Sequence, residues 1–461
     1  MYLYLTASLD ATIYEGHPSS NFGQSSFLKV GRVREDDGLK RYRSLIKFDL
    51  DYAYSLWNGG IGSNFINTHS SNPTFSLHLF DVYSPQGNQP YGFEICADNL
   101  SINKFSNEGR GIEEDGYHTG APSWIEPMGG VSWTTTGSDH YINAPAGSAS
   151  MRFESGDEDL QIDIWNYVDL YGSSNKGRYG LVLRLSDDET SDGGFDSENI
   201  EEVNTKMFYS RQTSTIFQPR LEIWWDNSIQ DDKGRFKYGA SKNNSLAYYN
   251  YSKSRLQDVT DNDMYLEIFP SGVSHLIGSY TAAHVTTGIY LVENVNITGS
   301  YGTSNIDYWE LQWKSASTLH NTEYITGSSE VNYSEINSDD EMVINIKNLR
   351  SIYSVDEFVR FDLFIRPRYP VYGFTSGNEH LGNMIIPDMW YEIVDADDFS
   401  TKYKFMPFNN VATRLSYDNG GNYFNLMMSS FNRHRTYNIK LKYMLNNQTI
   451  IHSKRFLFKV V

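Results

Sequence analysis

The sequence predicts an all-β protein built from three consecutive β-sandwich domains. Aromatic residues make up 15% of the 461 residues, and such residues fit the pleated, half-buried surface of a strand. Gly occurs 36 times, which supplies the turns that many short strands need. No window keeps apolar residues at the i, i+3, i+4, i+7 spacing beyond about two turns, so the periodicity favours strands over amphipathic helices.

Residues 1–227 predict a jelly-roll-like β-sandwich. Strands are expected at 4–14, 27–32, 44–50, 75–82, 159–168 and 179–187, with long polar loops between them. The stretch 204–227 pairs two more strand-like runs and ends the domain. Its second run alternates Leu221, Ile223 and Trp225 against Arg220, Glu222 and Trp224. The long insert at about 97–150 predicts an ordered surface excursion.

Two smaller immunoglobulin-like β-domains are expected to follow, at 228–349 and 350–461. Alternation of apolar and polar residues predicts strands at 263–270, 306–314 and 341–349 in the first of them. In the second, alternation predicts strands at 358–368 and 436–445, and Asn446 and Asn447 then supply the turn of a terminal hairpin. Units of roughly 100 residues with several short strands are typical of such sandwiches.

Composition excludes several functional classes. A formal net charge of −19 makes sequence-independent binding of DNA or RNA unfavourable. The single cysteine, Cys96, rules out an intrachain disulfide and has no neighbouring basic residue that would activate a thiol. The first residues lack the basic and apolar regions of a signal peptide, and no apolar run has the length of a membrane span. We therefore expect synthesis in a cytoplasm and no membrane insertion.

The sequence predicts no enzyme and no cofactor. Its 11 histidines are scattered, and neither a zinc-binding His pattern, nor a nucleophile elbow, nor a phosphate-binding glycine loop is present. A glycosidase carboxylate pair drawn from Glu113, Glu114, Asp115 or the acidic clusters at 156–160 and 186–202 is an alternative, but an acidic β-protein offers such pairs without any activity.

One acidic segment, residues 186–202, is a weak candidate for Ca²⁺ binding. Calcium prefers six to eight oxygen ligands, often from aspartates on flexible loops that contain glycine. The candidate ligands are Asp187, Asp188, Asp192 and Asp196. Their spacing does not match an EF-hand loop, and a solvated, mobile acidic loop is the simpler interpretation of the segment.

Tryptophans are the candidate binding residues. Aromatic faces stack on sugar rings and anchor protein interfaces, which makes Trp124, Trp133, Trp224 and Trp225 candidates for either role. Trp224 and Trp225 are adjacent on one predicted strand and must point to opposite faces. We expect one of them in the core and the other facing outward or towards a neighbouring domain.

Several motifs occur in order across the first domain. They are DATI at 10–13, NFGQSSFLKVG at 21–31, RSLIKFDL at 43–50, FESGDEDL at 153–160, and FYSR at 208–211 with PRLE at 219–222. Through these motifs residues 1–227 resemble the DNRLRE-type domain, a β-sandwich related in shape to carbohydrate-binding modules. The Trp224–Trp225 pair departs from the family pattern, which more often has one large residue beside charged ones.

The layout of the whole chain resembles large virion proteins of tailed phages, particularly marine myophages. The C-terminal segments that take part in this resemblance are YFNL at 423–426, RTYNIKLK at 435–442 and FLFKV at 456–460. The resemblance implies a non-enzymatic component of the tail, neck or capsid surface, present in multiple copies and docked on other virion proteins. A carbohydrate-binding adhesin arm that contacts host glycans is the alternative.

Overall fold

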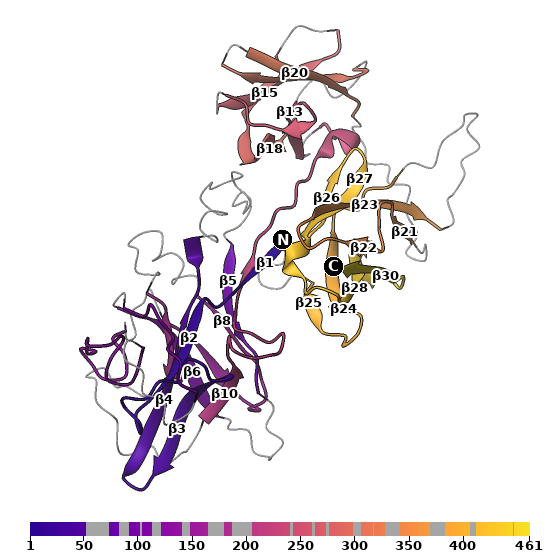
Figure 1. The fold of residues 1–461 in the computed structure, drawn as a ribbon. Helices are drawn as coiled ribbons and strands as arrows, with labels where there is room; N and C mark the ends of the chain where they lie inside the picture. Colours follow the sequence, from indigo (N-terminus) through magenta and orange to yellow (C-terminus); the bar gives the residue numbers. More distant parts are fainter. Residues whose placement is uncertain are drawn as a thin grey trace. The chain divides into compact units, whose positions relative to one another are not determined.

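The fold is all-β, as the sequence predicts (Figure 1). The computed structural model describes residues 1–51, 73–82, 92–101, 104–112, 121–140, 148–164, 179–186, 205–239, 243–260, 263–272, 276–297, 306–316, 318–327, 342–368, 383–405, 412–445 and 447–461. We name its three parts the N-terminal sandwich (β1–β11), the middle sandwich (β12–β20) and the C-terminal sandwich (β21–β30). No helix in these described ranges is long and apolar enough to span a membrane.

The chain divides into two compact units. One contains Leu3–Ser55 and Thr74–Ile223, which is the N-terminal sandwich. The other contains Met1–Tyr2 together with Trp224–Val461, which holds the middle and C-terminal sandwiches. The division between Ile223 and Trp224 lies close to the predicted boundary at residue 227.

The N-terminal sandwich has two sheets. One has the strand order β1-β11-β5-β8, and the other has the order β10-β3-β4-β9-β6-β7 with β2 also paired to β4. The strands are β1 (Tyr2–Thr6), β2 (Leu9–Tyr14), β3 (Phe27–Glu35), β4 (Gly38–Lys47), β5 (Thr74–Leu79), β6 (Phe93–Asn99), β7 (Ser148–Phe153), β8 (Leu160–Asp163), β9 (Leu181–Leu185), β10 (Thr205–Tyr209) and β11 (Arg220–Trp224). Side chains such as Leu45, Leu77 and Leu221 are fully buried in this sandwich.

The predicted strand at 4–14 is two strands in different sheets. The backbone N–H of Ala7 donates to Pro219 O (3.1 Å), whereas the next N–H, of Ser8, donates to Lys47 O (2.8 Å). The chain therefore passes from one sheet to the other between these two residues. Periodicity could not reveal this crossing because the apolar alternation continues on both sides of it.

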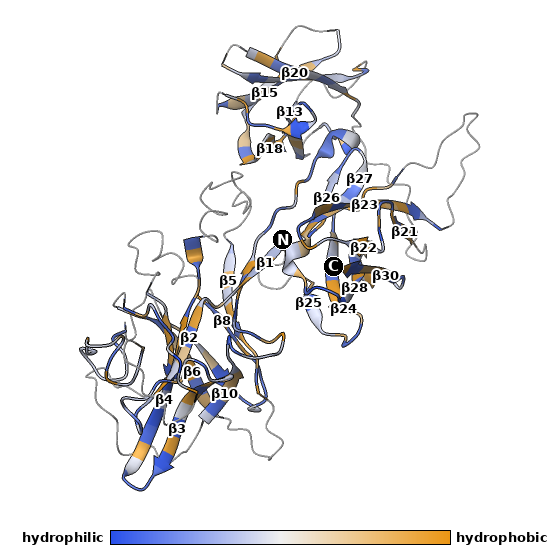
Figure 2. Cartoon of the chain, in the orientation of Figure 1, coloured by the Kyte–Doolittle hydropathy of each residue, from blue (hydrophilic) through white to orange (hydrophobic). Residues whose placement is uncertain are grey.

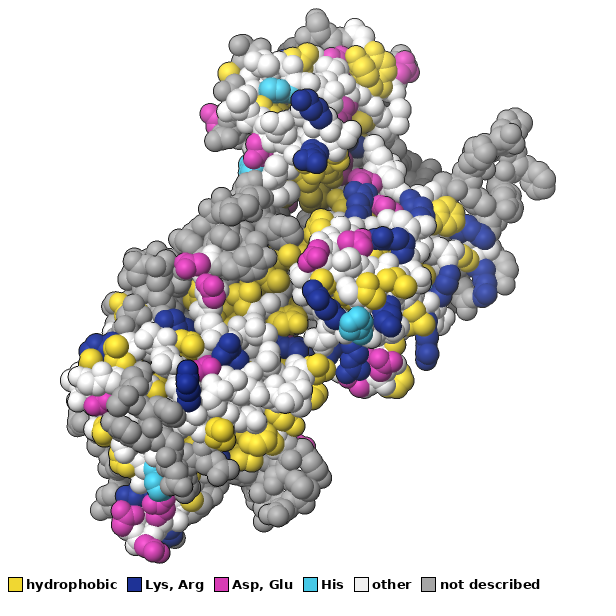
Figure 3. All heavy atoms as spheres, viewed as in Figure 1, with side chains coloured by type: hydrophobic (Ala, Val, Ile, Leu, Met, Phe, Trp, Pro, Cys, Tyr) yellow, Lys and Arg dark blue, Asp and Glu magenta, His cyan; other side chains and the backbone are white. Residues whose placement is uncertain are grey.

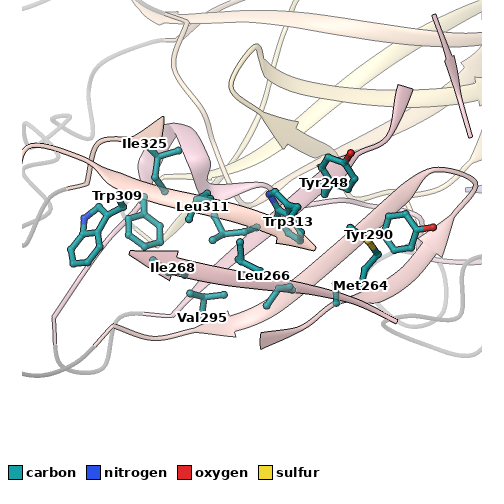
Figure 4. Close-up of a cluster of buried hydrophobic side chains, with 14 of the residues drawn as sticks. Tyr248, Met264, Leu266, Ile268, Tyr290, Val295, Trp309, Leu311, Trp313 and Ile325 are labelled. Atoms are coloured by element: carbon teal, nitrogen blue, oxygen red, sulfur yellow. The ribbon is translucent and has the colours of Figure 1, made fainter. Parts of the chain in front are cut away.

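The middle sandwich packs a three-stranded sheet, β12-β18-β17, with a four-stranded sheet, β16-β15-β19-β20. Its strands are β12 (Asn244–Tyr249), β13 (Tyr251–Ser252), β14 (Arg255–Leu256), β15 (Met264–Pro270), β16 (Gly278–Thr281), β17 (Ala283–Thr286), β18 (Ile289–Val295), β19 (Trp309–Ser315) and β20 (Thr318–Ile325). Leu266 and Trp313 from one sheet meet Tyr248 and Val295 from the other in the core (Figure 4). The rings of Tyr248 and Trp313 stack with centroids 5.4 Å apart.

The C-terminal sandwich packs the sheet β21-β23-β27-β26 against the sheet β22-β30-β28-β24-β25, to which β29 adds through β28. Its strands are β21 (Met342–Ile346), β22 (Ile352–Tyr353), β23 (Phe358–Pro367), β24 (Met389–Asp395), β25 (Thr401–Tyr403), β26 (Ser416–Asp418), β27 (Gly421–Met427), β28 (Thr436–Leu445), β29 (Gln448–Ile451) and β30 (Phe456–Val460). Aromatic side chains join the two sheets, since Phe424 stacks on both Phe361 (5.1 Å) and Tyr391 (4.5 Å). Hydrophobic and hydrophilic residues alternate along these strands, as Figure 2 shows.

In the C-terminal sandwich, the domain assignment of one strand and the length of the terminal hairpin differ from the expectation from sequence. Strand β21, which the boundary at 349 assigned to the middle domain, pairs antiparallel with β23 of the C-terminal sandwich, from Met342↔Pro367 to Ile346↔Leu363. The expected terminal hairpin is present, with Leu445 opposite Gln448 and Asn447 at a φ of 61°. Its returning strand β29 is short, and β30 then pairs with the other half of β28.

Candidate binding cleft

All four candidate tryptophans are buried. Trp124 and Trp133 are 3% and 5% exposed and belong to the core of the N-terminal sandwich with Leu45 and Val182. The indole N–H of Trp133 donates to Ser123 O (2.9 Å). The expectation that these rings are available for stacking on a glycan or a partner is therefore wrong for this structure, because the insert that carries them folds back onto the sandwich.

Trp224 and Trp225 are also both buried, at 3% and 0% exposed. The ring of Trp224 contacts the rings of Tyr2 (4.2 Å) and Tyr403 (5.8 Å), and the backbone N–H of Trp225 donates to Met1 O (3.0 Å). The pair thus lies in the unit that contains the C-terminal sandwich, not in the unit of the N-terminal one. Strand alternation left open whether the second ring faces outward or towards a neighbouring domain, and the contact of Trp224 with Tyr403 corresponds to the second alternative.

The candidate calcium ligands Asp187, Asp188, Asp192 and Asp196 lie outside the described residues, as do Glu113, Glu114 and Asp115. Among the described residues, no group of three or more His, Cys, Asp and Glu side chains could hold a metal ion.

The neighbouring acidic stretch at 156–160 has a structural role. Glu158 Oε atoms accept the backbone N–H groups of Glu154 (2.8 Å), Ser155 (2.7 Å) and Gly156 (2.6 Å). Burial opposes ionisation, but these hydrogen bonds outweigh it and lower the pKa of Glu158 to about 2. The carboxylate therefore stabilises a turn and is not a candidate ligand for a metal ion.

A histidine lies between two carboxylates on the N-terminal sandwich. His78 Nδ1 is 2.9 Å from Glu222 Oε1, and its Nε2 is 3.3 Å from Asp159 Oδ2. Burial alone lowers the pKa of His78, but the two carboxylates outweigh burial and raise it. The three side chains come from β5, β11 and the turn before β8, so this ion-pair network links the strands of one sheet.

A second buried network ties the predicted motif residues together. Asn21 Nδ2 donates to Glu108 O (2.8 Å) and Pro122 O (2.9 Å), while its Oδ1 accepts the N–H groups of Gly23 (3.2 Å) and Gly111 (3.1 Å). A Cβ atom on Gly23 would lie 1.8 Å from Glu108 O, so this position requires glycine. The asparagine and glycine of the motif therefore fix the 104–112 segment to the sandwich.

A cleft with a ligand-sized volume lies in the other unit, between the middle and C-terminal sandwiches. Backbone pairing in the 229–232 segment brings the two together: Tyr417 N–H donates to Ile229 O (3.0 Å), and Asp231 N–H donates to Tyr417 O (3.0 Å). The Tyr417 hydroxyl also donates to Asp232 Oδ1 (3.0 Å) in a buried contact. Beside this connection lies a cavity of about 410 Å³.

The cleft has an apolar floor and a polar, aromatic rim. Its floor includes the buried side chains of Ile229, Val285 and Ile289. Its rim carries Tyr251, 64% exposed, on the middle sandwich and Phe358, 55% exposed, on the C-terminal sandwich. Exposed rings above an apolar floor are typical of sites that take a small ligand or a short segment of chain.

Charged and amide groups complete the C-terminal wall of the cleft. The guanidinium of Arg360 lies over the ring of Tyr423, 3.5 Å from its centroid, and donates to Asp362 Oδ1 (2.8 Å) and Asp418 Oδ2 (2.8 Å). Burial opposes the charge of Arg360, but these two carboxylates help to raise its pKa above the ordinary value. Burial raises the pKa of Tyr423 as well, so the wall presents a neutral phenol beside a fixed cation.

The sequence pattern does not predict this cleft. Alternation along 358–365 places Phe358 and Arg360 on the outward face of a strand. This outward direction is the only property of the cleft that the local pattern indicates. Their meeting with Tyr251 depends on the pairing of the 229–232 segment with β26, about 185 residues away along the chain. No local pattern encodes that pairing.

Comparisons with known proteins match this chain to solved structures at low identity. No protein-family model matches the chain, and no curated protein is similar to it. A chimeric titin Z1Z2-Z1Z2 tandem is similar at 7% identity, covering 49% of this chain and 95% of that one, with a TM-score of 0.16. The FN1-FN3 domains of chicken CNTN1 match at 11% identity over 59% of this chain and 85% of that one, also with a TM-score of 0.16. The BSP domain of a biofilm-associated protein matches at 8% identity over 96% and 68%, with a TM-score of 0.17.

Proposed function

We propose that this chain is a non-enzymatic structural component of a tailed bacteriophage virion, at the tail, neck or capsid surface, that works through docking on other virion proteins. It would be made in the host bacterial cytoplasm and be present in multiple copies. The proposal rests on the ordered motifs of the first domain and on the layout of the whole chain. It needs no cofactor and no nucleic acid.

The observation that carries the proposal is that the distinctive polar residues of the N-terminal sandwich hold the sandwich together. Buried Asn21 fastens a loop through four hydrogen bonds. Buried Arg184 donates to Asp98 Oδ2 (2.7 Å), and buried Lys206 is paired with Asp81. Groups engaged in this way support a rigid domain, whose contacts with other proteins are then made by its surface.

Detection in the particle tests the proposal. Virions purified from a lysate should contain the protein at a fixed ratio to the major capsid protein, measured by quantitative mass spectrometry. Immunogold labelling should place it at one defined position on the particle. Absence of the protein from particles that remain infectious would overturn the proposal.

A carbohydrate-binding adhesin arm is the second candidate, and the cleft favours it. The exposed rings of Tyr251 and Phe358 could stack on a sugar, while Asn227 and Asn425 supply amides beside the apolar floor. Glycan arrays with the full chain test this function, with Tyr251→Ala and Phe358→Ala as variants and Tyr308→Ala, an exposed tyrosine that does not line the cleft, as the matched control. Binding that the two cleft variants lose and the control keeps would support the adhesin; absence of binding to any glycan would exclude it.

A further inference from the structure

Charge is distributed very unevenly along the chain. Residues 350–461 contain 14 Lys and Arg against 10 Asp and Glu, a net charge of +4, although the whole chain carries −19. Residues 1–227 carry −16 and residues 228–349 carry −7. The C-terminal sandwich is thus a basic domain attached to two acidic ones, and Lys and Arg gather on its surface in Figure 3.

Three of these cations lie on the outward face of one sheet. Cross-strand pairing places Lys459 of β30 beside Ile352 of β22, and Lys442 of β28 beside Ile451 of β29. Lys440 points to the same side, two residues before Lys442. The residues that alternate with them, including Tyr437, Leu441 and Phe458, are buried in the core.

Large apolar side chains surround the lysines on this face. Ile352, Ile451 and Leu457 are 53%, 60% and 47% exposed. Together with Lys440, Lys442 and Lys459 they define what we call the lysine face. Clustered apolar residues of this size at a domain surface mark interaction sites more often than single exposed ones do.

The acidic groups close to the lysine face leave much of its charge uncompensated. Glu392 of β24, opposite Lys440, is 3.1 Å from Lys440 Nζ. The ammonium of Lys442 lies over the rings of Trp390 (5.4 Å) and Phe405 (4.7 Å). An acidic protein surface would therefore meet cations set among apolar side chains, the combination that gives both orientation and desolvation at an interface.

We propose that the lysine face docks on the acidic N-terminal sandwich of a second copy of this chain. The complementarity is provided by the chain itself, because its first 227 residues carry the −16 net charge. The contact is head-to-tail, so repeated copies form a ring or an open row rather than a two-fold dimer. The inference deepens the proposed docking function and rests on it.

Sedimentation velocity of the full chain tests the proposal. At roughly 50 mM NaCl the chain should associate with increasing concentration, and at roughly 500 mM NaCl it should be monomeric, because the screening length falls well below about 10 Å. The double variant Lys440→Glu, Lys459→Glu should raise the dissociation constant by at least about tenfold. Lys347→Glu is the control: it reverses the charge of one exposed lysine that lies outside the lysine face, and it should leave the dissociation constant unchanged.

Cross-linking with a reagent that joins amines to carboxyl groups identifies the partner surface. Links from Lys459 of one copy should map to acidic residues of the N-terminal sandwich of another, distinguished by isotope labelling of one copy. Links from Lys459 that reach only acidic residues of another copy's C-terminal sandwich, a monomer at both salt concentrations, or equal effects of the double variant and the Lys347→Glu control would each overturn the proposal. Binding of a DNA duplex by a chain that stays monomeric would instead assign the face to a polyanion. A protein that is monomeric yet present in purified virions would overturn this inference and leave the proposed function standing.

Discussion

Asp10 makes the stability of the N-terminal sandwich depend on pH in a direction unusual for an aspartate. Its side chain is 1% exposed at the second position of β2. Its Oδ2 accepts the backbone N–H of Arg211 (2.6 Å), and that residue's guanidinium is held by Glu108 (2.9 Å). Burial raises the pKa of Asp10 from 3.8 to about 7, although the hydrogen bond from Arg211 opposes the rise.

The sign and size of the effect follow from these two pKa values. The folded state holds the Asp10 proton more tightly than the unfolded chain, so its stabilising contribution is complete below about pH 4 and is lost as the pH rises through about 7. A difference of about three pH units corresponds to about 4 kcal/mol. That amount is a large part of the stability of an ordinary domain.

Replacement of Asp10 by asparagine removes this ionisation and keeps an oxygen that can accept the Arg211 N–H. We expect Asp10→Asn to be close to the wild type in stability below about pH 4 and more stable by up to about 4 kcal/mol at about pH 8. Urea unfolding at several pH values, followed by tryptophan emission, measures the difference between variant and wild type. Asp36→Asn, at an exposed position in the β3–β4 turn, is the control. Parallel pH dependences for the wild type and Asp10→Asn would refute the reasoning.

Three further perturbations test other parts of the structure. Asn21→Ala should destabilise the N-terminal sandwich by about 3 kcal/mol, because it leaves buried donors and acceptors without partners; a loss below about 1 kcal/mol in urea unfolding would contradict this role. Trp313→Ala should cost about 3–5 kcal/mol through the cavity left in the middle sandwich, whereas alanine at exposed Tyr324 should cost little. NMR titration should give His78 a pKa above 6.5, and this pKa should fall in the variant Glu222→Gln. An unchanged pKa in that variant would show that the ion pair with Glu222 does not raise the pKa of His78.

The sequence allowed the strand faces to be predicted better than the partners of each strand. Alternation in 358–367 correctly placed Phe361 and Leu363 inside, because side-chain direction is a local property of a strand. The same signal assigned β21 to the wrong domain, since alternation does not say which strand lies alongside. The alternatives for Trp224, facing outward or towards a neighbouring domain, stayed open for a related reason: Tyr403, which contacts it, is 179 residues away in the chain.

The placement of residues 1 and 2 in the unit that also contains the C-terminal sandwich has a consequence for biosynthesis. Ser430 Oγ donates to Tyr2 O (3.2 Å), a contact between positions 428 residues apart. A ribosome adding about 5–20 residues per second needs about 20 to 90 seconds to make the intervening chain. During that interval residues 3–223 can already have folded, whereas Ser430, which contacts Tyr2, has not yet been synthesised. Closure of the second unit is therefore expected to be a late event in synthesis, and a chain that stalls before Ser430 would leave Tyr2 exposed to proteases.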